Sequence, residues 1–176
     1  MRELRKHILF DADTIAARVR QIGREISANH PEGDLLFVGI LKGSFMFLAD
    51  LIRALDRPCQ VDFAKIASYG SGTVSSGKLD IILDIGSSVK DKNVILVDDI
   101  VDSGLTLSEY RTTLAQKGPR SLEIAALIDK TGRRERPVEI DYCGFRIEEG
   151  FVVGYGLDCD ERFRNLRGVY VLEEEL

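Results

Sequence analysis

The segment 98–107, with the sequence DDIVDSGLTL, combines residue types that suit a phosphorylated ligand. Gly104 allows a tight turn, so that the backbone N–H groups of residues 102–106 gather at the start of a following helix. Such a cluster of N–H groups binds anions, and phosphate in particular. Ser103 and Thr106 add hydroxyl donors at the same place.

Three carboxylates accompany this predicted phosphate site. Asp98 and Asp99 follow the apolar run at 93–97, where carboxylates can hold vicinal hydroxyls or a hydrated Mg²⁺. Taken alone, Asp102 would be interpreted as a helix cap. Together the groups predict a sugar phosphate with free hydroxyls as the ligand, bound with a metal ion. The sequence has neither the Gly-Lys-Ser/Thr loop of nucleoside triphosphatases nor the spaced glycines of dinucleotide sites.

The elements that must position these residues alternate between strand and helix. This order predicts an α/β fold with a mostly parallel, twisted sheet flanked by helices, in a single domain over residues 1–176. Apolar runs at 35–41, 93–97 and 122–128 are typical of strands buried on both faces. Further strands are expected near 61–67, 78–85, 138–142, 150–154 and 169–172, and helices from Asp13, over 44–55, and from Thr106 to Gly118-Pro119. Ligands of such sheets bind past the carboxyl ends of the strands.

Composition argues against several classes of protein. The 176 residues include 24 basic and 29 acidic side chains, a net charge of −5 that disfavours a nonspecific binder of nucleic acid or of a membrane surface. No apolar run is long enough to cross a membrane, and no secretory signal is visible. Cys59, Cys143 and Cys159 form no close pair, which favours free thiols in a cytoplasmic protein.

The stretch VILVDDIVDSGLTL resembles the phosphoribosyl-pyrophosphate (PRPP) motif of the type I phosphoribosyltransferases. Other stretches resemble the bacterial hypoxanthine(-guanine) branch of that family, and these are LKGS at 41–44, SYGSGT at 68–73, IDKTGRR at 128–134 and FVVGYGLDCDERFRNL at 151–166. The resemblance covers about residues 5–172. It implies a base-binding hood at about 130–172, a flexible lid loop at about 68–77, and a homodimer or homotetramer.

The resemblance also implies a reaction, the Mg²⁺-dependent transfer of 5-phosphoribose from PRPP to N9 of hypoxanthine, with guanine as a second acceptor. In that reading the segment 102–106, including Leu105, binds the 5-phosphate. Asp98 and Asp99 hold the ribose hydroxyls and the metal. Asp102 handles the proton at purine N7. The partners are then two small molecules, PRPP and a 6-oxopurine, and no nucleic acid or membrane.

Further roles follow from the resemblance for residues around the reacting centre. Leu41, Lys42 and Gly43 bind pyrophosphate, in the family often through a non-proline cis peptide. A Lys-Gly pair after a buried strand is also a fair anion site on physical grounds. Ser68 and Tyr69, on the lid, close over the reacting centre and exclude water.

The base and the leaving group have their own implied contacts. Lys130 donates to the purine O6, which favours a 6-oxopurine over adenine. Phe151 stacks on the base, and the backbone of Val152 reads its edge. Asp158 contacts the base edge and helps hold a second Mg²⁺, and Arg164 contacts pyrophosphate. Considered alone, Lys130 would be a solvated charge and Phe151 a core residue.

Three positions depart from the pattern of many relatives. Asp98 stands where many carry glutamate, Ala67 where some carry lysine, and Leu105 where some carry a basic residue. Other functions remain open at this point. These are a preference for xanthine with guanine, a PRPP-sensing regulator that binds nucleic acid on the same fold, and a metal-dependent phosphate-ester hydrolase.

Overall fold

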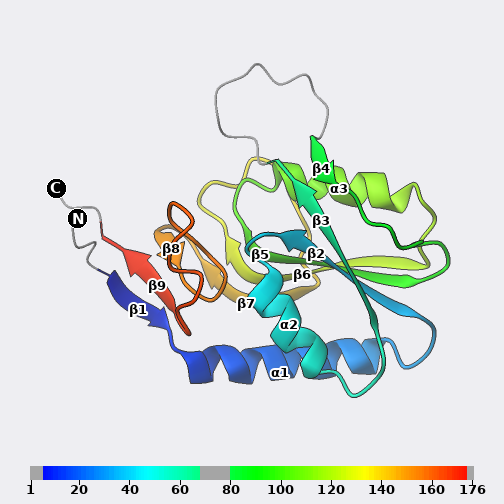
Figure 1. Ribbon diagram of the computed structural model, residues 1–176, viewed down its shortest axis with the longest axis horizontal. Coiled ribbons are helices and arrows are strands. Elements are labelled where there is room, and N and C mark those ends of the chain that lie inside the picture. The colour runs from blue at the N-terminus through cyan, green and yellow to red at the C-terminus, as the bar shows by residue number, and fades with distance from the viewer. Residues whose placement is uncertain (1–5, 68–79, 174–176) are drawn as a thin grey trace.

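A computed structural model describes residues 6–67 and 80–173 of the chain. The predicted lid at 68–77, with Ser68 and Tyr69, lies outside the described residues. The elements follow in the order β1 (Lys6–Phe10), α1 (Ala12–Asn29), β2 (Leu35–Leu41), α2 (Phe45–Arg53), β3 (Gln60–Ile66), β4 (Ile81–Leu83), β5 (Asn93–Val101), α3 (Leu105–Ala115), β6 (Ser121–Lys130), β7 (Tyr142–Ile147), β8 (Phe151–Val153) and β9 (Val169–Leu172) (Figure 1).

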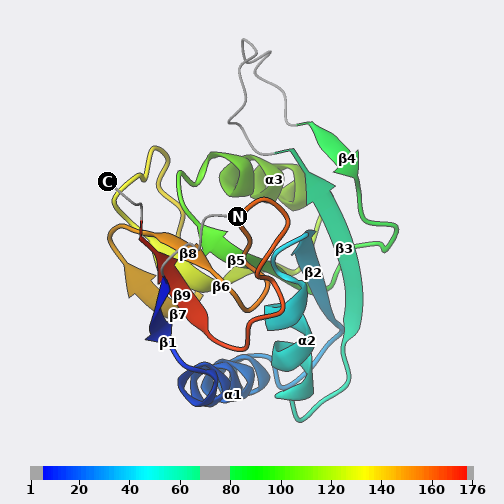
Figure 2. The ribbon, with the colours of Figure 1, turned by 60° about the vertical axis from the view of Figure 1, so that its left-hand side comes forward.

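Two sheets organise these elements. Six strands form one sheet in the order β4-β3-β2-β5-β6-β7, in which only β4 runs antiparallel to its neighbour. The strands β1-β9-β8 form a smaller antiparallel sheet beside it (Figure 2). The predicted mostly parallel sheet with flanking helices is therefore confirmed.

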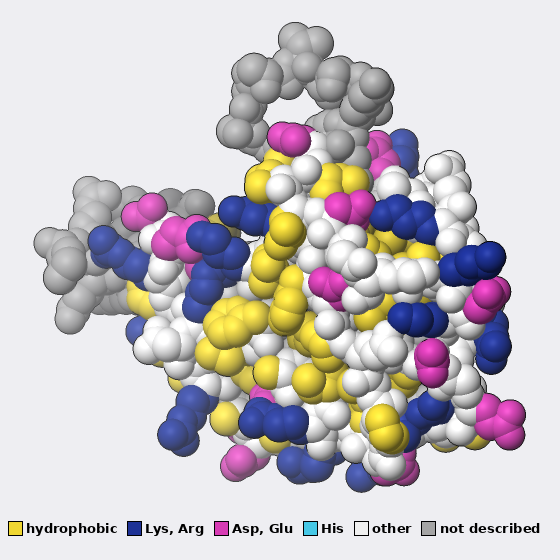
Figure 3. Space-filling model, turned by 45° about the vertical axis from the view of Figure 1, so that its right-hand side comes forward, with side chains coloured by type: hydrophobic (Ala, Val, Ile, Leu, Met, Phe, Trp, Pro, Cys, Tyr) yellow, Lys and Arg dark blue, Asp and Glu magenta, His cyan; other side chains and the backbone are white. Residues whose placement is uncertain are grey.

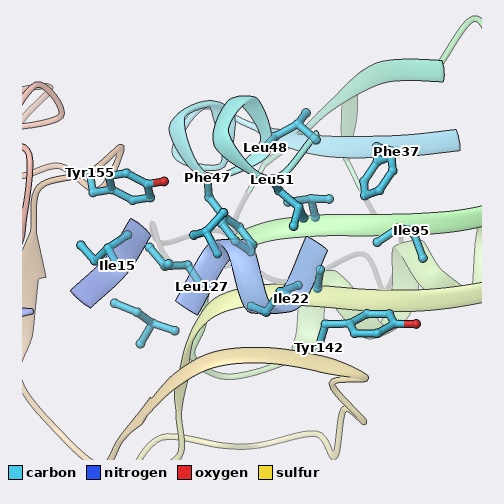
Figure 4. Packing of buried hydrophobic residues seen from close by; sticks show 14 of the residues in the cluster. Ile15, Ile22, Phe37, Phe47, Leu48, Leu51, Ile95, Leu127, Tyr142 and Tyr155 are labelled. Atoms are coloured by element: carbon cyan, nitrogen blue, oxygen red, sulfur yellow. The ribbon is translucent and has the colours of Figure 1, made fainter. Parts of the chain in front are cut away.

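The core consists of two hydrophobic layers, one on each face of the large sheet. Alternate residues of each central strand point to opposite faces, so Ile95 packs toward α1 and α2 whereas Leu96 packs toward α3. Figure 4 shows the first layer, where Ile15 and Ile22 of α1 lie beside Phe47 of α2. Because both faces are covered, the middle parts of β2, β5 and β6 are apolar on both faces, as parallel strands in α/β proteins are. The polar ends of the strands are the part of the sheet that is left to bind a ligand.

The first helix begins at Ala12, one residue before the expected start at Asp13. Asp11, rather than Asp13, is the N-cap, and its carboxylate accepts a hydrogen bond of 2.7 Å from the Thr14 N–H. Asp13 lies in the first turn, where its negative charge faces the positive end of the helix dipole. The expected apolar stripe from Ile15 to Ile26 is buried.

Several strand boundaries also differ from expectation. The strand expected at 138–142 is wrong, because β7 begins at Tyr142 and the preceding residues pack as irregular chain against the layer under α3. Gly144 weakens the strand pattern of β7, because glycine is not typical of the interior of a strand. A β-carbon at this position would lie 2.3 Å from the Leu127 carbonyl oxygen. This glycine therefore permits close strand contact. Of the strand expected at 78–85, only the three residues of β4 are described as strand.

The surface in Figure 3 mixes charges of both signs around a central band of hydrophobic side chains. Exposed large hydrophobic residues include Val61 on β3 and Ile82 and Leu83 on β4. Within the described residues, no helix is long and apolar enough to cross a membrane.

Candidate active site

A pocket of about 320 Å³ opens at the carboxyl ends of the central strands. Its wall combines the ends of β2, β3 and β5 with the turn that leads into α3, and the lining residues are Ile40, Leu41, Lys42, Ile66, Asp98, Asp99, Ile100, Val101, Asp102, Ser103, Gly104, Thr106 and Leu107. Most residues predicted to bind phosphate, ribose and pyrophosphate therefore share one cavity.

The turn before α3 has the geometry of an anion site. Gly104 is the N-cap of the helix and has a φ of 79°, a conformation that favours glycine. A β-carbon on it would also lie 2.5 Å from the Arg136 carbonyl oxygen. Glycine offers no side chain to cap α3, and the Leu105 N–H makes only a long hydrogen bond of 3.4 Å to the Ser103 hydroxyl, so the first turn of the helix can still offer N–H groups to a phosphate.

The two consecutive aspartates lie inside β5, which continues four residues beyond its expected end. Burial raises the pKa of Asp98 well above its ordinary value, and the charge of Asp99 raises it further. Burial also raises the pKa of Asp99, although hydrogen bonding with Asp98 and the nearby Arg164 oppose this shift. Two carboxylates held this close in a poorly solvated place favour a bound cation.

Gly43, the second residue after β2, packs closely against the Asp99 carboxylate. A β-carbon at Gly43 would lie 1.8 Å from Asp99 Oδ2. The loop after β2 and the Asp99 carboxylate on β5 are thus in direct contact. The peptide bond between Leu41 and Lys42 in this loop is cis.

The cations predicted to bind pyrophosphate are paired with acids. Glu161 bridges them, with Oε1 2.8 Å from Lys42 Nζ and Oε2 3.1 Å from Arg164 Nη2. These hydrogen bonds lower the pKa of Glu161. Arg164 Nη2 also lies 2.8 Å from Asp158 Oδ1. The sequence reasoning missed Glu161, although an acid three residues before Arg164 was a signal for such a pair.

Asp102 and Lys130 face each other across the ends of β5 and β6. Lys130 Nζ lies 3.5 Å from Asp102 Oδ2, and its side chain is only 11% exposed. The other carboxylate oxygen, Asp102 Oδ1, is buried and has no hydrogen-bond partner among the described residues. A buried oxygen without a partner is costly unless a ligand supplies a donor.

Two of the residues predicted to contact the base, Phe151 and Val152, lie on β8. Phe151 is 53% exposed, so it is not the core residue that its apolar neighbours would indicate. Val152 is buried, and its backbone lies in the strand that pairs with β9. The exposed ring of Phe151 is therefore free to stack on a flat ligand.

The donor set fits a magnesium ion that keeps other ligands. Among the described residues, no three His, Cys, Asp or Glu side chains gather at one place. The Asp98 carboxylate accepts a hydrogen bond from the Asp99 N–H, while Asp158 is engaged with Arg164 and with the Glu161 N–H. Mg²⁺ commonly binds one or two carboxylates and takes its remaining ligands from water and phosphates.

Comparison with known proteins places these features in a family. The sequence profile of the phosphoribosyl transferase domain matches residues 7–160. The hypoxanthine-guanine phosphoribosyltransferase of Mycobacterium avium is 42% identical, over 96% of this chain and 86% of that protein. That of Bacillus subtilis is 39% identical, over 94% of this chain and 92% of that protein.

Two further comparisons concern a longer relative and a solved structure. The bifunctional protein TilS/HprT of Listeria innocua is 40% identical over 96% of this chain, which spans only 26% of that protein's length. A crystal structure of a hypoxanthine phosphoribosyltransferase from Staphylococcus aureus has a TM-score of 0.90 at 39% identity, covering 97% of this chain and 92% of that one.

Proposed function

The chain belongs to the phosphoribosyltransferase family, and on that premise we propose that it transfers 5-phosphoribose from PRPP to N9 of hypoxanthine. Guanine is a second acceptor, and pyrophosphate is the other product. The observation that carries the proposal is the Asp102–Lys130 pair beside the predicted phosphate turn. A site for PRPP alone needs no such pair, whereas a 6-oxopurine uses both groups.

The pair suits the base on chemical grounds. A carboxylate at Asp102, which lines the pocket, can take the N7 proton as N9 becomes the nucleophile. The Lys130 ammonium has donors only, so it bonds an oxygen at purine C6. Adenine would present an amino donor there, which leaves both groups without a partner. Phe151 stacks on the base and limits its tilt, and the Val152 backbone reads the base edge.

The phosphates occupy the two anion sites. The 5-phosphate lies on the N–H groups of residues 102–106, with hydroxyl donors from Ser103 and Thr106. The pyrophosphate lies between Lys42 and Arg164, and it takes the place of the Glu161 carboxylate that now pairs with both. Arg164 is only 19% exposed and also donates to the Gly156 carbonyl, so its position is set before the ligand arrives.

The reaction leaves negative charge on the departing pyrophosphate and develops positive charge on the ribose, and both must be stabilised. Asp98 and Asp99, and at a second place Asp158, would hold Mg²⁺, which when bound would supply positive charge for the pyrophosphate leaving group. The C1–O bond breaks with oxocarbenium character, and purine N9 attacks C1. Asp98 and Asp99 bind the ribose hydroxyls and support the positive charge that develops on the ring. Ser68 and Tyr69 are proposed to exclude water, which would otherwise hydrolyse this species.

We further propose a homodimer or homotetramer that works in the cytoplasm. The exposed apolar side chains of Val61, Ile82 and Leu83 support association, because such side chains gain from being covered. Free cysteines fit a reducing compartment. Light scattering of the purified protein at several concentrations would determine the oligomeric state. A monomer at every concentration would contradict the proposed homodimer or homotetramer.

A panel of bases tests the proposed reaction. The protein, PRPP and Mg²⁺ are incubated with hypoxanthine, guanine, xanthine, adenine or orotate, and nucleotide product is measured. We expect product from hypoxanthine and guanine and none from adenine or orotate. Measurable PRPP binding without product from any base would indicate a sensor instead, and phosphate release without a base would indicate a hydrolase.

A further inference from the structure

A buried ion pair lies behind the pocket and takes no part in the steps above. Arg134 Nη2 lies 2.5 Å from Asp129 Oδ1, and the two side chains are 17% and 8% exposed. The other carboxylate oxygen of Asp129 accepts a hydrogen bond of 3.0 Å from Arg146 Nε on β7. Both oxygens are therefore used, and Asp129 holds the Arg134 guanidinium in one orientation.

The remaining donors of Arg134 reach the ends of two strands. Its Nε donates to the Asp102 carbonyl at 2.9 Å, and its Nη2 donates to the Val101 carbonyl at 3.0 Å and, more weakly, to the Lys130 carbonyl at 3.3 Å. One planar guanidinium thus joins the backbone under Asp102 to the backbone under Lys130. These are the two residues whose side chains face each other at 3.5 Å.

The phosphate turn is held by a different set of contacts. The Ser103 carbonyl accepts hydrogen bonds of 3.0 Å from the N–H groups of Glu135 and Arg136. Gly104 packs against the Arg136 carbonyl. The two hydrogen bonds to Ser103 involve backbone atoms only and hold the middle of the turn, although the Arg134 side chain also lies beside Gly104 and bonds the Asp102 carbonyl at the start of the turn.

We propose that Arg134 is a positioning residue for the base half of the reaction. Oriented by Asp129, it fixes the distance between the Asp102 carboxylate and the Lys130 ammonium, while the backbone hydrogen bonds to the Ser103 carbonyl still hold the phosphate turn in its absence. This inference rests on the proposed transfer to a 6-oxopurine. It predicts that replacing Arg134 lowers turnover but leaves the affinity for PRPP nearly unchanged.

The kinetic test uses Arg134→Lys and Arg134→Ala, with Arg133→Ala as the matched control. Lysine keeps the charge but lacks the planar fork that reaches several acceptors at once. Arg133, the exposed neighbour, shares none of the contacts of Arg134. We expect kcat with hypoxanthine to fall at least about tenfold in both Arg134 variants, because a displacement of about 1 Å can cost about a hundredfold. The KM for PRPP should stay within about threefold of wild type.

Chemical rescue separates positioning from a general loss of structure. Free guanidinium at millimolar concentration should restore part of kcat in Arg134→Ala, and should not do so in Arg133→Ala. Unchanged kcat in both Arg134 variants would overturn the proposal. So would a fall in kcat accompanied by an equal loss of PRPP affinity and no rescue. If Arg134→Ala does not fold, the test rests on Arg134→Lys. The proposal then requires that kcat falls in this variant while the KM for PRPP does not rise.

A second readout does not depend on activity. Amide hydrogen exchange of the ligand-free protein should be faster at residues 101–102 and at 130 in Arg134→Lys, and unchanged in Arg133→Ala. Unchanged exchange in Arg134→Lys contradicts the positioning role even if the proposed reaction is right. An inactive wild-type protein with the predicted exchange pattern would instead overturn the reaction and leave the backbone contacts in place.

Discussion

Gly43→Ala is a small substitution that should disable the site without unfolding the protein. The φ of Gly43 is outside the left-handed region, so alanine is compatible with the backbone. The added β-carbon, however, would lie 1.8 Å from Asp99 Oδ2 and 2.3 Å from Asp99 Cγ. The conflict is therefore with one carboxylate of the pocket rather than with the backbone conformation.

The size of the effect follows from the overlap. Ordinary contact begins at about 3.4 Å, so the alanine methyl and the carboxylate must separate by about 1.6 Å. A misplacement of about 1 Å can reduce turnover about a hundredfold, which corresponds to about 2.7 kcal/mol of activation free energy. Overpacking should lower the free energy of unfolding by about 1–3 kcal/mol, which a domain of this size tolerates.

The assay compares kcat/KM for PRPP in wild type, Gly43→Ala and Gly86→Ala, together with thermal unfolding of each. Gly86 is the matched control, because a β-carbon there would have nothing within 4 Å. We expect a loss of about a hundredfold for Gly43→Ala and less than about threefold for Gly86→Ala. If Gly43→Ala keeps kcat/KM within about threefold of wild type, the contact between the β2 loop and Asp99 does not matter to the reaction.

Two other perturbations probe the base site and the stability of the fold. Phe151→Ala should raise the KM for hypoxanthine about tenfold or more, since stacking of a base on an aromatic ring is worth about 1–3 kcal/mol, and an unchanged KM would remove Phe151 from the site. Burial acts to raise the pKa of Asp84, but hydrogen bonds from Lys117, Tyr110 and the Ile85 N–H outweigh it and lower the pKa below the usual 3.8. The stabilisation from Asp84 is therefore present above about pH 4 and is lost as the pH falls through the folded-state pKa. Urea unfolding between pH 6 and pH 3 should show a shallower loss of stability in Asp84→Asn than in wild type, and equal slopes would contradict this assignment.

The sheet could be predicted because its central strands are apolar on both faces, a pattern that β2, β5 and β6 all show. The boundaries were less accurate where polar residues continue a strand. Asp98 pairs in register with Ala126, so β5 does not end where its apolar run ends. The pairing of β1 with β9 joins segments near opposite ends of the chain, and no local pattern indicates it.

The same contrast between local sequence and long-range contacts applies to the site. The phosphate turn is contiguous in sequence, so its residue types and spacing were enough to predict its chemistry. Glu161 and Arg134 were missed because their roles depend on contacts with residues brought near by folding, such as Lys42 for the first and Val101 for the second. The burial of Asp129, which calls for a cation beside it, is itself visible only in the folded chain.

The most direct measurement of the central claim is steady-state turnover of Asp102→Asn, with PRPP affinity measured in parallel by calorimetry. Asparagine keeps the shape of the side chain and removes its ability to take a proton, so kcat with hypoxanthine should fall about a hundredfold or more. PRPP affinity should change by less than about threefold, because the phosphate turn uses backbone N–H groups. Near-normal turnover of Asp102→Asn would contradict the role of this carboxylate and with it the chemistry assigned to the Asp102–Lys130 pair.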